Sequence, residues 1–287
     1  MIDLEVNRER TDLMHYKTLN NGLDIPQLGY GVWKVPDAEA ESAVEQALEA
    51  GYRLIDTAKV YRNEVGVGKA LATSNVPRED LFITTKLWNA DHGYENTLQA
   101  FDESLEKLGL DYVDLYLIHW PTPLYDMYVE SYKALETIYK DGRAKAIGVC
   151  NFDIEHLQRI LDECEIIPTV NQVECHPYLQ QTELKKFCKE HGILLEAYSP
   201  LMNGTKVLYD PVIQELANQY GKTPAQVILR WHLQSDVIVI PKTVTPSRMN
   251  ENLDVFDFEL SNADMSKIAT LDRNDRHNAV PSELNNR

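Results

Sequence analysis

Long hydrophobic runs are absent from this 287-residue sequence, and both cysteine and basic residues are scarce. No stretch approaches the ~18 consecutive apolar residues of a membrane-spanning helix, so we expect no membrane segment. The four cysteines have no C-x-x-C spacing, which argues against a structural zinc site and favours free thiols in a reducing compartment. Residues 1–14 are charged and lack the apolar core of a signal peptide. We therefore expect a cytoplasmic protein.

The charge balance excludes another group of functions. The chain has 28 Lys and Arg residues against 45 Asp and Glu residues, which gives a formal net charge of −17. Such a surface repels nucleic acids and anionic membranes, and we expect neither as a partner. An anionic ligand therefore needs a local group of positive side chains in this protein.

We expect the protein to be a monomer, with a dimer as the alternative.

Common nucleotide and metal motifs are missing too. Gly29-Tyr30-Gly31 and Gly66-Val67-Gly68 both lack the third glycine of G-x-G-x-x-G, which argues against a Rossmann domain. The chain has no G-x-x-x-x-G-K-[ST] phosphate loop and no H-x-H or H-E-x-x-H pair. We therefore expect no metal site, and a metal-dependent barrel hydrolase is a disfavoured alternative.

What the sequence does contain is an alternation of strand and helix patterns. Strand-like runs occur at 28–32, 54–56, 81–86, 112–119, 146–149, 169–173, 193–198 and 237–240. Helical patterns separate most of them, and two further helices are expected at 246–253 and 263–271. The Asn20-Asn21-Gly22 turn predicts a hairpin between 16–19 and 23–25 that plugs one end of the fold. The count of eight strands favours closure into a (β/α)8 TIM barrel, with an open parallel sheet as the alternative. We expect one domain, 1–287, with a flexible arm at 1–14 and a tail at 272–287.

Polar residues follow the apolar part of successive predicted strands. In a parallel barrel these ends converge on one mouth, where active sites lie. The residues concerned are Asp56, Lys86, His119, Asn151, Gln172, Tyr198 and Lys242.

Four side chains suit proton donation to an oxygen. Tyrosine, with a pKa of ~10, is a weak acid near neutrality unless a cation stabilises its phenolate. Lys86 could do this for Tyr61, while Asp56 keeps the lysine charged, and His119 could hydrogen-bond a carbonyl oxygen. Singly, each has an ordinary explanation: Asp56 as a helix N-cap, Lys86 as a solvated loop residue and His119 as a bonded core histidine.

Residues 51–64, G-Y-R-L-I-D-T-A-K-V-Y-R-N-E, resemble the first signature of the aldo-keto reductases, within which the bacterial glyoxal and 2,5-diketogluconate reductase branch is most similar. The resemblance covers about residues 15–275. It implies NADPH-dependent carbonyl reduction on a TIM barrel, with Tyr61 as general acid beside Asp56, Lys86 and His119.

The resemblance also implies a nicotinamide site. Residues 148–152, G-V-C-N-F, resemble the family's G-V-S-N-F segment, and Cys150 stands where serine is usual. Asn151 and Gln172 would hold the carboxamide, and Tyr198 would stack on the ring, although it could be an ordinary strand-end aromatic. The adjoining Ser199 and Leu201 are expected to contact the cofactor as well.

A second cofactor block lies near the C-terminus. Lys242, Thr243 and Arg248 surround a helix start, which suits a phosphate group. By resemblance they bind the adenosine 2′-phosphate of NADP(H), while Glu251 and Asn252 contact the adenine. A surface helix with scattered cations is the alternative.

Three tryptophans follow strand ends: Trp33, Trp88 and Trp120. We expect them to line, with His119, a pocket for a small carbonyl substrate. Packing at the barrel rim is the alternative. The polar segment 276–287 departs from the family pattern. We expect an NADP-dependent reductase of small aldehydes, ketones or dicarbonyls. A cofactor-binding regulatory subunit with little catalysis is the alternative.

Overall fold

A parallel sheet of eight strands forms the centre of the computed structural model, which describes residues 15–286. The expected arm at 1–14 lies outside this range. The spatial order is β10-β9-β8-β7-β6-β5-β4-β3, so strands that follow one another in sequence are neighbours in space. Their bounds are β3 (Tyr30–Gly31), β4 (Leu54–Asp56), β5 (Phe82–Leu87), β6 (Val113–Ile118), β7 (Ala144–Cys150), β8 (Val170–Glu174), β9 (Leu194–Tyr198) and β10 (Ile238–Val239).

The two outermost strands of this order meet and close the sheet. Leu28, just before β3, forms a parallel bridge with Val239 of β10. The Gly29 N–H donates to the Val239 carbonyl at 2.8 Å, and the Val239 N–H donates to the Gln27 carbonyl at 3.0 Å. The barrel favoured by the sequence pattern is therefore confirmed.

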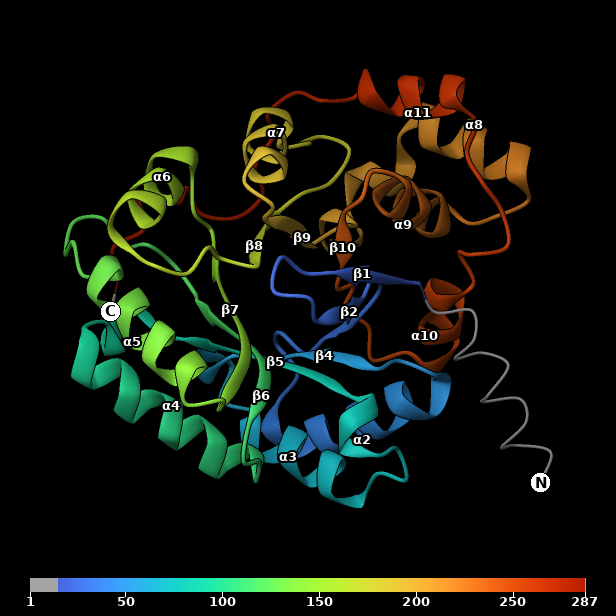
Figure 1. Ribbon diagram of the computed structural model, residues 1–287. Coiled ribbons are helices and arrows are strands. Elements are labelled where there is room, and N and C mark those ends of the chain that lie inside the picture. The colour runs from blue at the N-terminus through green and yellow to red at the C-terminus, as the bar shows by residue number, and fades with distance from the viewer. Residues whose placement is uncertain (1–14, 287) are drawn as a thin grey trace.

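A hairpin of β1 (Tyr16–Thr18) and β2 (Asp24–Pro26) covers one end of the barrel (Figure 1). Leu19 and Ile25 are buried among the inward side chains of the strands. The Asn20 amide donates to the Pro168 carbonyl at 3.0 Å, just before β8 begins. The hairpin thus plugs the N-terminal end, as predicted, and leaves the opposite end for the site.

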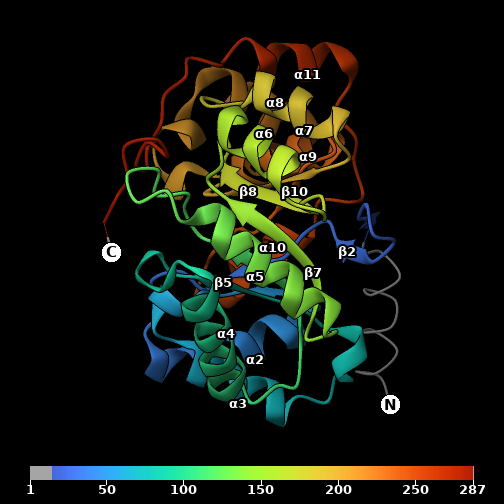
Figure 2. The same cartoon turned by 60° about the vertical axis from the view of Figure 1, so that its left-hand side comes forward.

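Helices surround the barrel, and their apolar faces pack against the strands (Figures 1 and 2). They are α2 (Asp37–Ala50), α3 (Glu64–Thr73), α4 (Tyr94–Leu108), α5 (Tyr128–Lys140), α6 (Ile154–Glu163), α7 (Thr182–Glu190), α8 (Pro211–Tyr220), α9 (Pro224–Gln234), α10 (Pro246–Leu253) and α11 (Asn262–Ala269). Within residues 15–286, none is long and apolar enough to cross a membrane.

Helix α3 was not among the helices that the sequence pattern predicted. Gly66 and Gly68 lower its intrinsic helix propensity. Packing explains both glycines. A Cβ on Gly66 would lie 2.4 Å from the Asp37 carbonyl oxygen, and one on Gly68 would lie 2.6 Å from the Leu108 carbonyl oxygen. The close approach to α2 and α4 therefore outweighs the propensity cost.

Candidate active site

A buried ion pair lies at the centre of the barrel's C-terminal end. The Lys86 Nζ donates to both carboxylate oxygens of Asp56, at 2.7 and 2.8 Å, and to the Thr57 carbonyl at 2.9 Å. Lys86 is 0% exposed and Asp56 is 2% exposed. Burial lowers the pKa of Lys86, but Asp56, Tyr61 and Cys150 together raise it by more, so the net pKa lies above its usual value and the ammonium stays charged. The solvated-lysine alternative is therefore wrong.

Tyr61 lies over this pair because the chain turns back after β4. The short 3-10 helix η1 (Lys59–Tyr61) brings its hydroxyl to 3.5 Å from the Lys86 Nζ. Burial raises the pKa of Tyr61, and Lys86 acts in the expected opposite direction without cancelling it. The net pKa is therefore above the ordinary value. Tyr61 holds its proton at neutral pH, and Lys86 stabilises the phenolate left after the proton is given away.

His119 follows β6 and faces Tyr61. The two ring centroids are 5.7 Å apart, with an interplanar angle of 77°. Burial lowers the pKa of His119 well below its usual value, and the charge of Lys86 acts in the same direction. The imidazole is therefore neutral. Its Nδ1 is buried without a hydrogen-bond partner among residues 15–286.

Two of the three predicted pocket tryptophans lie beside His119. The Trp88 ring meets it edge-on at 5.5 Å, and the Trp120 ring is stacked at 6.5 Å. Trp33 differs, because it is 37% exposed and the Lys34 ammonium lies 4.2 Å from its ring centroid. No ring contact joins Trp33 to His119 in the described part of the chain. Apolar walls thus adjoin the polar cluster on the Trp88 and Trp120 side.

The nicotinamide residues implied by the sequence are joined to the same cluster. The Tyr198 hydroxyl donates to the Asn151 side-chain oxygen at 2.7 Å. The Asn151 amide donates to the His119 carbonyl at 3.0 Å and to the Cys150 sulfur at 3.2 Å. Asn151 has a left-handed backbone, with φ of 63°, which asparagine tolerates better than most residues. These bonds fix the orientation of Asn151 and Tyr198.

Gln172 lies inside β8 rather than at its end. Its amide nitrogen donates to Asp56 Oδ2 at 2.8 Å and to Glu196 Oε2 at 2.8 Å. Its oxygen accepts a weak bond from the Cys150 thiol at 3.7 Å. The structure thus joins Gln172 to the ion pair, leaving only its oxygen for a carboxamide.

Two buried glutamates at this end were not among the predicted site residues. Glu196 lies within β9, and Glu174 ends β8; both are 0% exposed. An acid inside an apolar strand, as in L-L-E-A-Y, was the signal that could have found Glu196.

Two predicted phosphate-binding cations lie unpaired at the start of α10. Lys242 and Arg248 are exposed, and neither forms an ion pair within residues 15–286. Thr243 follows Lys242 in the sequence and is 8% exposed, and its hydroxyl accepts the Thr245 N–H at 3.1 Å. The helix N-terminus adds further positive potential. This donor set fits a phosphate group.

The other predicted cofactor contacts are bonded to or packed against the protein itself. The Glu251 carboxylate accepts a hydrogen bond from the Thr223 hydroxyl at 2.7 Å, and Asn252 is 4% exposed. The Ser199 hydroxyl donates to the Asn203 side chain at 3.2 Å, while Leu201 is half-buried against the core. All four stay predicted contacts of the cofactor.

The C-terminal tail crosses the same end of the barrel. The backbone N–H groups of His277 and Asn278 donate to the Glu174 carboxylate at 2.7 and 2.9 Å. Farther on, the Asn285 side chain accepts the Leu124 N–H at 2.8 Å. Figure 2 shows this segment running from α11 to the loop that precedes α5. The tail therefore lies beside the mouth, where it can contact a substrate.

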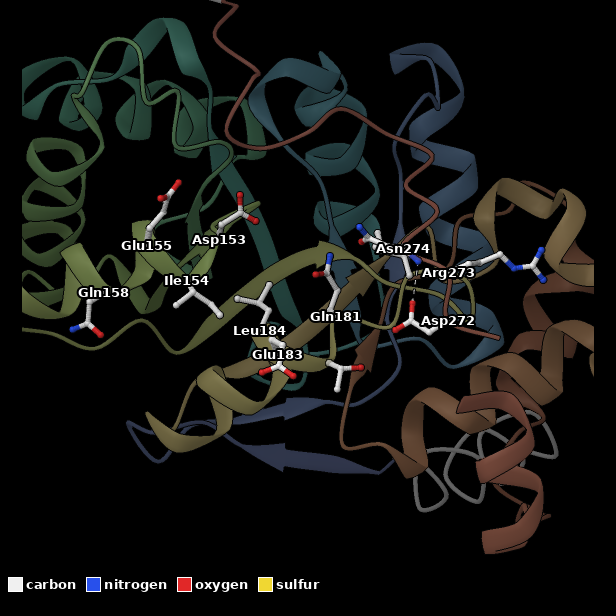
Figure 3. Close-up of a pocket in the computed structure, with 12 residues that line it drawn as sticks. Asp153, Ile154, Glu155, Gln158, Gln181, Glu183, Leu184, Asp272, Arg273 and Asn274 are labelled. Carbon is white, nitrogen blue, oxygen red and sulfur yellow. Dashed lines mark hydrogen bonds between the residues drawn. The ribbon is translucent and has the colours of Figure 1, made fainter. Parts of the chain in front are cut away.

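A surface pocket of about 1020 Å³ lies elsewhere, between α6, α7 and the tail (Figure 3). Its lining includes four acidic side chains, while the Arg273 guanidinium points away from the others and pairs with Asp210. None of the predicted site residues lines it. Its negative charge disfavours a dinucleotide there.

Comparison with known protein families agrees with this geometry. The model of the aldo/keto reductase family matches residues 26–273. The chain belongs to the aldo/keto reductase family.

Individual members of the family are similar along nearly the whole chain. Methylglyoxal reductase DkgA of Escherichia coli K12 is 52% identical over 267 residues, covering 93% of this chain and 96% of the relative. Glyoxal reductase of Bacillus subtilis is 52% identical over 275 residues, covering 96% and 99%. A Gox0644 variant in complex with NADPH has a TM-score of 0.91 at 46% identity, with coverage of 94% and 98%. The Bombyx mori aldo-keto reductase in complex with NADP has a TM-score of 0.86 at 36% identity, with coverage of 92% and 94%.

Proposed function

We propose that this protein is an NADPH-dependent reductase that converts small aldehydes, ketones or dicarbonyls to alcohols. This proposal rests mainly on the buried cluster at the barrel mouth, which consists of Asp56, Lys86, Tyr61 and His119. Similarity to a methylglyoxal reductase and a glyoxal reductase supports dicarbonyl substrates. Two structural neighbours that hold NADPH or NADP support the cofactor. No feature of the described chain favours the regulatory-subunit alternative.

The four clustered residues have distinct tasks in this proposal. The carbonyl oxygen is received between the Tyr61 hydroxyl and the neutral His119 ring. His119 donates a hydrogen bond that orients the oxygen, and Tyr61 gives it a proton. Lys86 stabilises the resulting phenolate, and Asp56 holds the ammonium in place. Trp88 and Trp120 form an apolar wall that excludes water.

The chain offers a donor set for NADPH along the same end of the barrel. Asn151 and Tyr198 are oriented for the nicotinamide, and Lys242, Thr243 and Arg248 suit the 2′-phosphate. When bound, the cofactor supplies a hydride to the carbonyl carbon. At the nicotinamide site, Cys150 offers a thiol where serine is usual in the family, and a thiol is a weaker hydrogen-bond donor than a hydroxyl.

The direct test is the loss of dihydronicotinamide absorbance with purified protein, NADPH or NADH, and methylglyoxal, glyoxal or a sugar aldehyde. We expect faster consumption with NADPH than with NADH, and an alcohol product. Binding of NADPH without consumption of either cofactor across the carbonyl panel would support the regulatory alternative and overturn the proposal.

Arg248→Ala is expected to weaken NADPH binding by about 10- to 100-fold, because a charge-assisted bond to phosphate contributes about 1.5–3 kcal/mol. NADH lacks the 2′-phosphate, so its affinity is expected to stay within about twofold. Fluorescence titration of both dissociation constants measures the difference. Lys189→Ala, which removes an exposed cation on α7, is the matched control. Equal weakening of both cofactors would contradict the phosphate assignment.

We further propose a cytoplasmic monomer in which residues 15–286 form one domain. Cys150, Cys164, Cys175 and Cys188 are all free thiols, which supports a reducing compartment.

A further inference from the structure

One buried acid at the barrel mouth has no part in the proposed mechanism. Glu196 lies in the middle of β9 and is 0% exposed. Its neighbours in register are Gln172 on β8 and Ile238 on β10. A fully buried glutamate is rare unless it is paired, so its partners need to be accounted for.

Its one hydrogen-bond partner in the described chain is shared with a catalytic carboxylate. The Gln172 amide nitrogen lies 2.8 Å from Glu196 Oε2 and 2.8 Å from Asp56 Oδ2. That nitrogen carries only two hydrogens, so these two carboxyl groups use both of them. Glu196 Oε1 is buried and has no hydrogen-bond partner within residues 15–286.

The charges around this group do not balance if both acids are ionised. Asp56 faces Glu196 from β4, Lys86 from β5 and Cys150 from β7. Lys86 is the one cation among them, and both its short side-chain contacts are to Asp56. A second carboxylate would therefore be buried without a counter-charge, which is costly. Burial raises the pKa of Glu196, Asp56 raises it further, and the result is about 8.

We propose that Glu196 is a positioning residue that keeps a proton at neutral pH, anchors Gln172 against Asp56 and so leaves Lys86 free to serve Tyr61. Ionisation of Glu196 adds a negative charge to the cluster. That charge disfavours the Tyr61 phenolate and slows proton donation. Its kinetic consequence rests on the proposed reductase function, whereas its protonation does not.

The first experiment measures protonation in the free protein, without cofactor. Unfolding by urea is followed from about pH 5.5 to 9 for wild type and Glu196→Gln, which keeps an acceptor oxygen. The pKa of Glu196 is raised from 4.5 in the unfolded chain to about 8, so between these values only the folded state holds the proton. Wild type therefore loses stability relative to the variant as pH rises. Its unfolding equilibrium constant increases, relative to that of the variant, by about tenfold per pH unit. Above about pH 8 the difference is constant.

Glu174→Gln is the matched control, because Glu174 is equally buried on the neighbouring strand. Bonds from His176, His277 and Asn278 outweigh burial and lower the pKa of Glu174 to about 2. The Glu174 carboxyl is therefore ionised in both the folded and the unfolded state over the measured range and contributes no pH-dependent step of its own. Parallel pH curves for wild type and Glu196→Gln would overturn the proposal.

The second experiment is the pH profile of kcat at saturating NADPH and carbonyl substrate. Wild type is expected to fall by about three- to tenfold through about pH 8 to a lower plateau, and Glu196→Gln is expected to lack this step. The same step in both proteins would refute the link to Tyr61. If the protein had no reductase activity, the proposed function would be wrong, but the protonation of Glu196 measured by the unfolding experiment would still stand.

Infrared spectroscopy of wild type removes any dependence on the variant's folding. A buried protonated carboxyl band is expected at about pH 7 and is expected to disappear at about pH 10. Its absence at about pH 7 would show that Glu196 is ionised, against the proposal.

Discussion

Tyr61→Phe is expected to lower kcat for carbonyl reduction by about 10²- to 10⁴-fold, the usual contribution of a positioned general acid. The substitution removes only the hydroxyl that lies 3.5 Å from the Lys86 Nζ. The ring that contacts His119 remains, so NADPH affinity and thermal stability are expected to change little. Steady-state kinetics with a dicarbonyl substrate, together with a fluorescence titration of NADPH, measures both effects.

Tyr139→Phe is the matched control for that substitution. Tyr139 lies on α5, partly buried against the outer core, and belongs to no part of the proposed site. It is expected to keep wild-type kcat. If Tyr61→Phe also kept near wild-type turnover, the proton would come from another group and the assignment would be wrong.

Lys86→Met is expected to destabilise the protein by about 3–5 kcal/mol, because it leaves the Asp56 carboxylate buried without its cation. Both residues are almost fully buried, so water cannot replace the lost contacts. The free energy of unfolding in urea measures the cost, and tryptophan fluorescence reports the transition. Turnover is expected to fall at least about 100-fold as well, since the Tyr61 phenolate loses its stabilising charge.

A double-variant cycle separates the two effects. The double variant Asp56→Asn with Lys86→Met also removes the carboxylate that Lys86→Met alone leaves without a cation. It is therefore expected to recover part of the stability lost in Lys86→Met. Turnover is not expected to recover, because the cation that serves Tyr61 is still absent. Additive stability changes would show that Asp56 and Lys86 are not coupled, contrary to their 2.7 Å contact.

The strand pattern of the sequence favoured a barrel over an open sheet, and the resemblance to the aldo-keto reductases implied one. The strands that end near Asp56, Lys86 and His119 are short apolar runs, and their polar termini are visible without a structure. The hairpin turn at Asn20–Gly22 is equally local, since Asn-Gly favours one turn geometry. Local chemistry of this kind can be read directly from the chain.

The misses have a different physical origin. Helix α3 depends on close contacts of Gly66 and Gly68 with distant backbone, which outweigh weak helix propensity. The burial of the Glu174 carboxylate is explained by hydrogen bonds from the backbone N–H groups of His277 and Asn278. These tail residues lie 103 and 104 positions away in the sequence. Glu196 gains its significance only because β8 places Gln172 between it and Asp56.

By itself the sequence determined the residue types and the order in which strands deliver them, because side-chain periodicity and turn chemistry are properties of neighbouring residues. Tertiary structure alone decided which groups share one desolvated space. There, burial keeps the proton on Tyr61 and Glu196 and removes it from His119, while one cation, Lys86, stays charged against Asp56. Protonation in such a site depends on distances and dielectric surroundings, and neither exists until the barrel has closed.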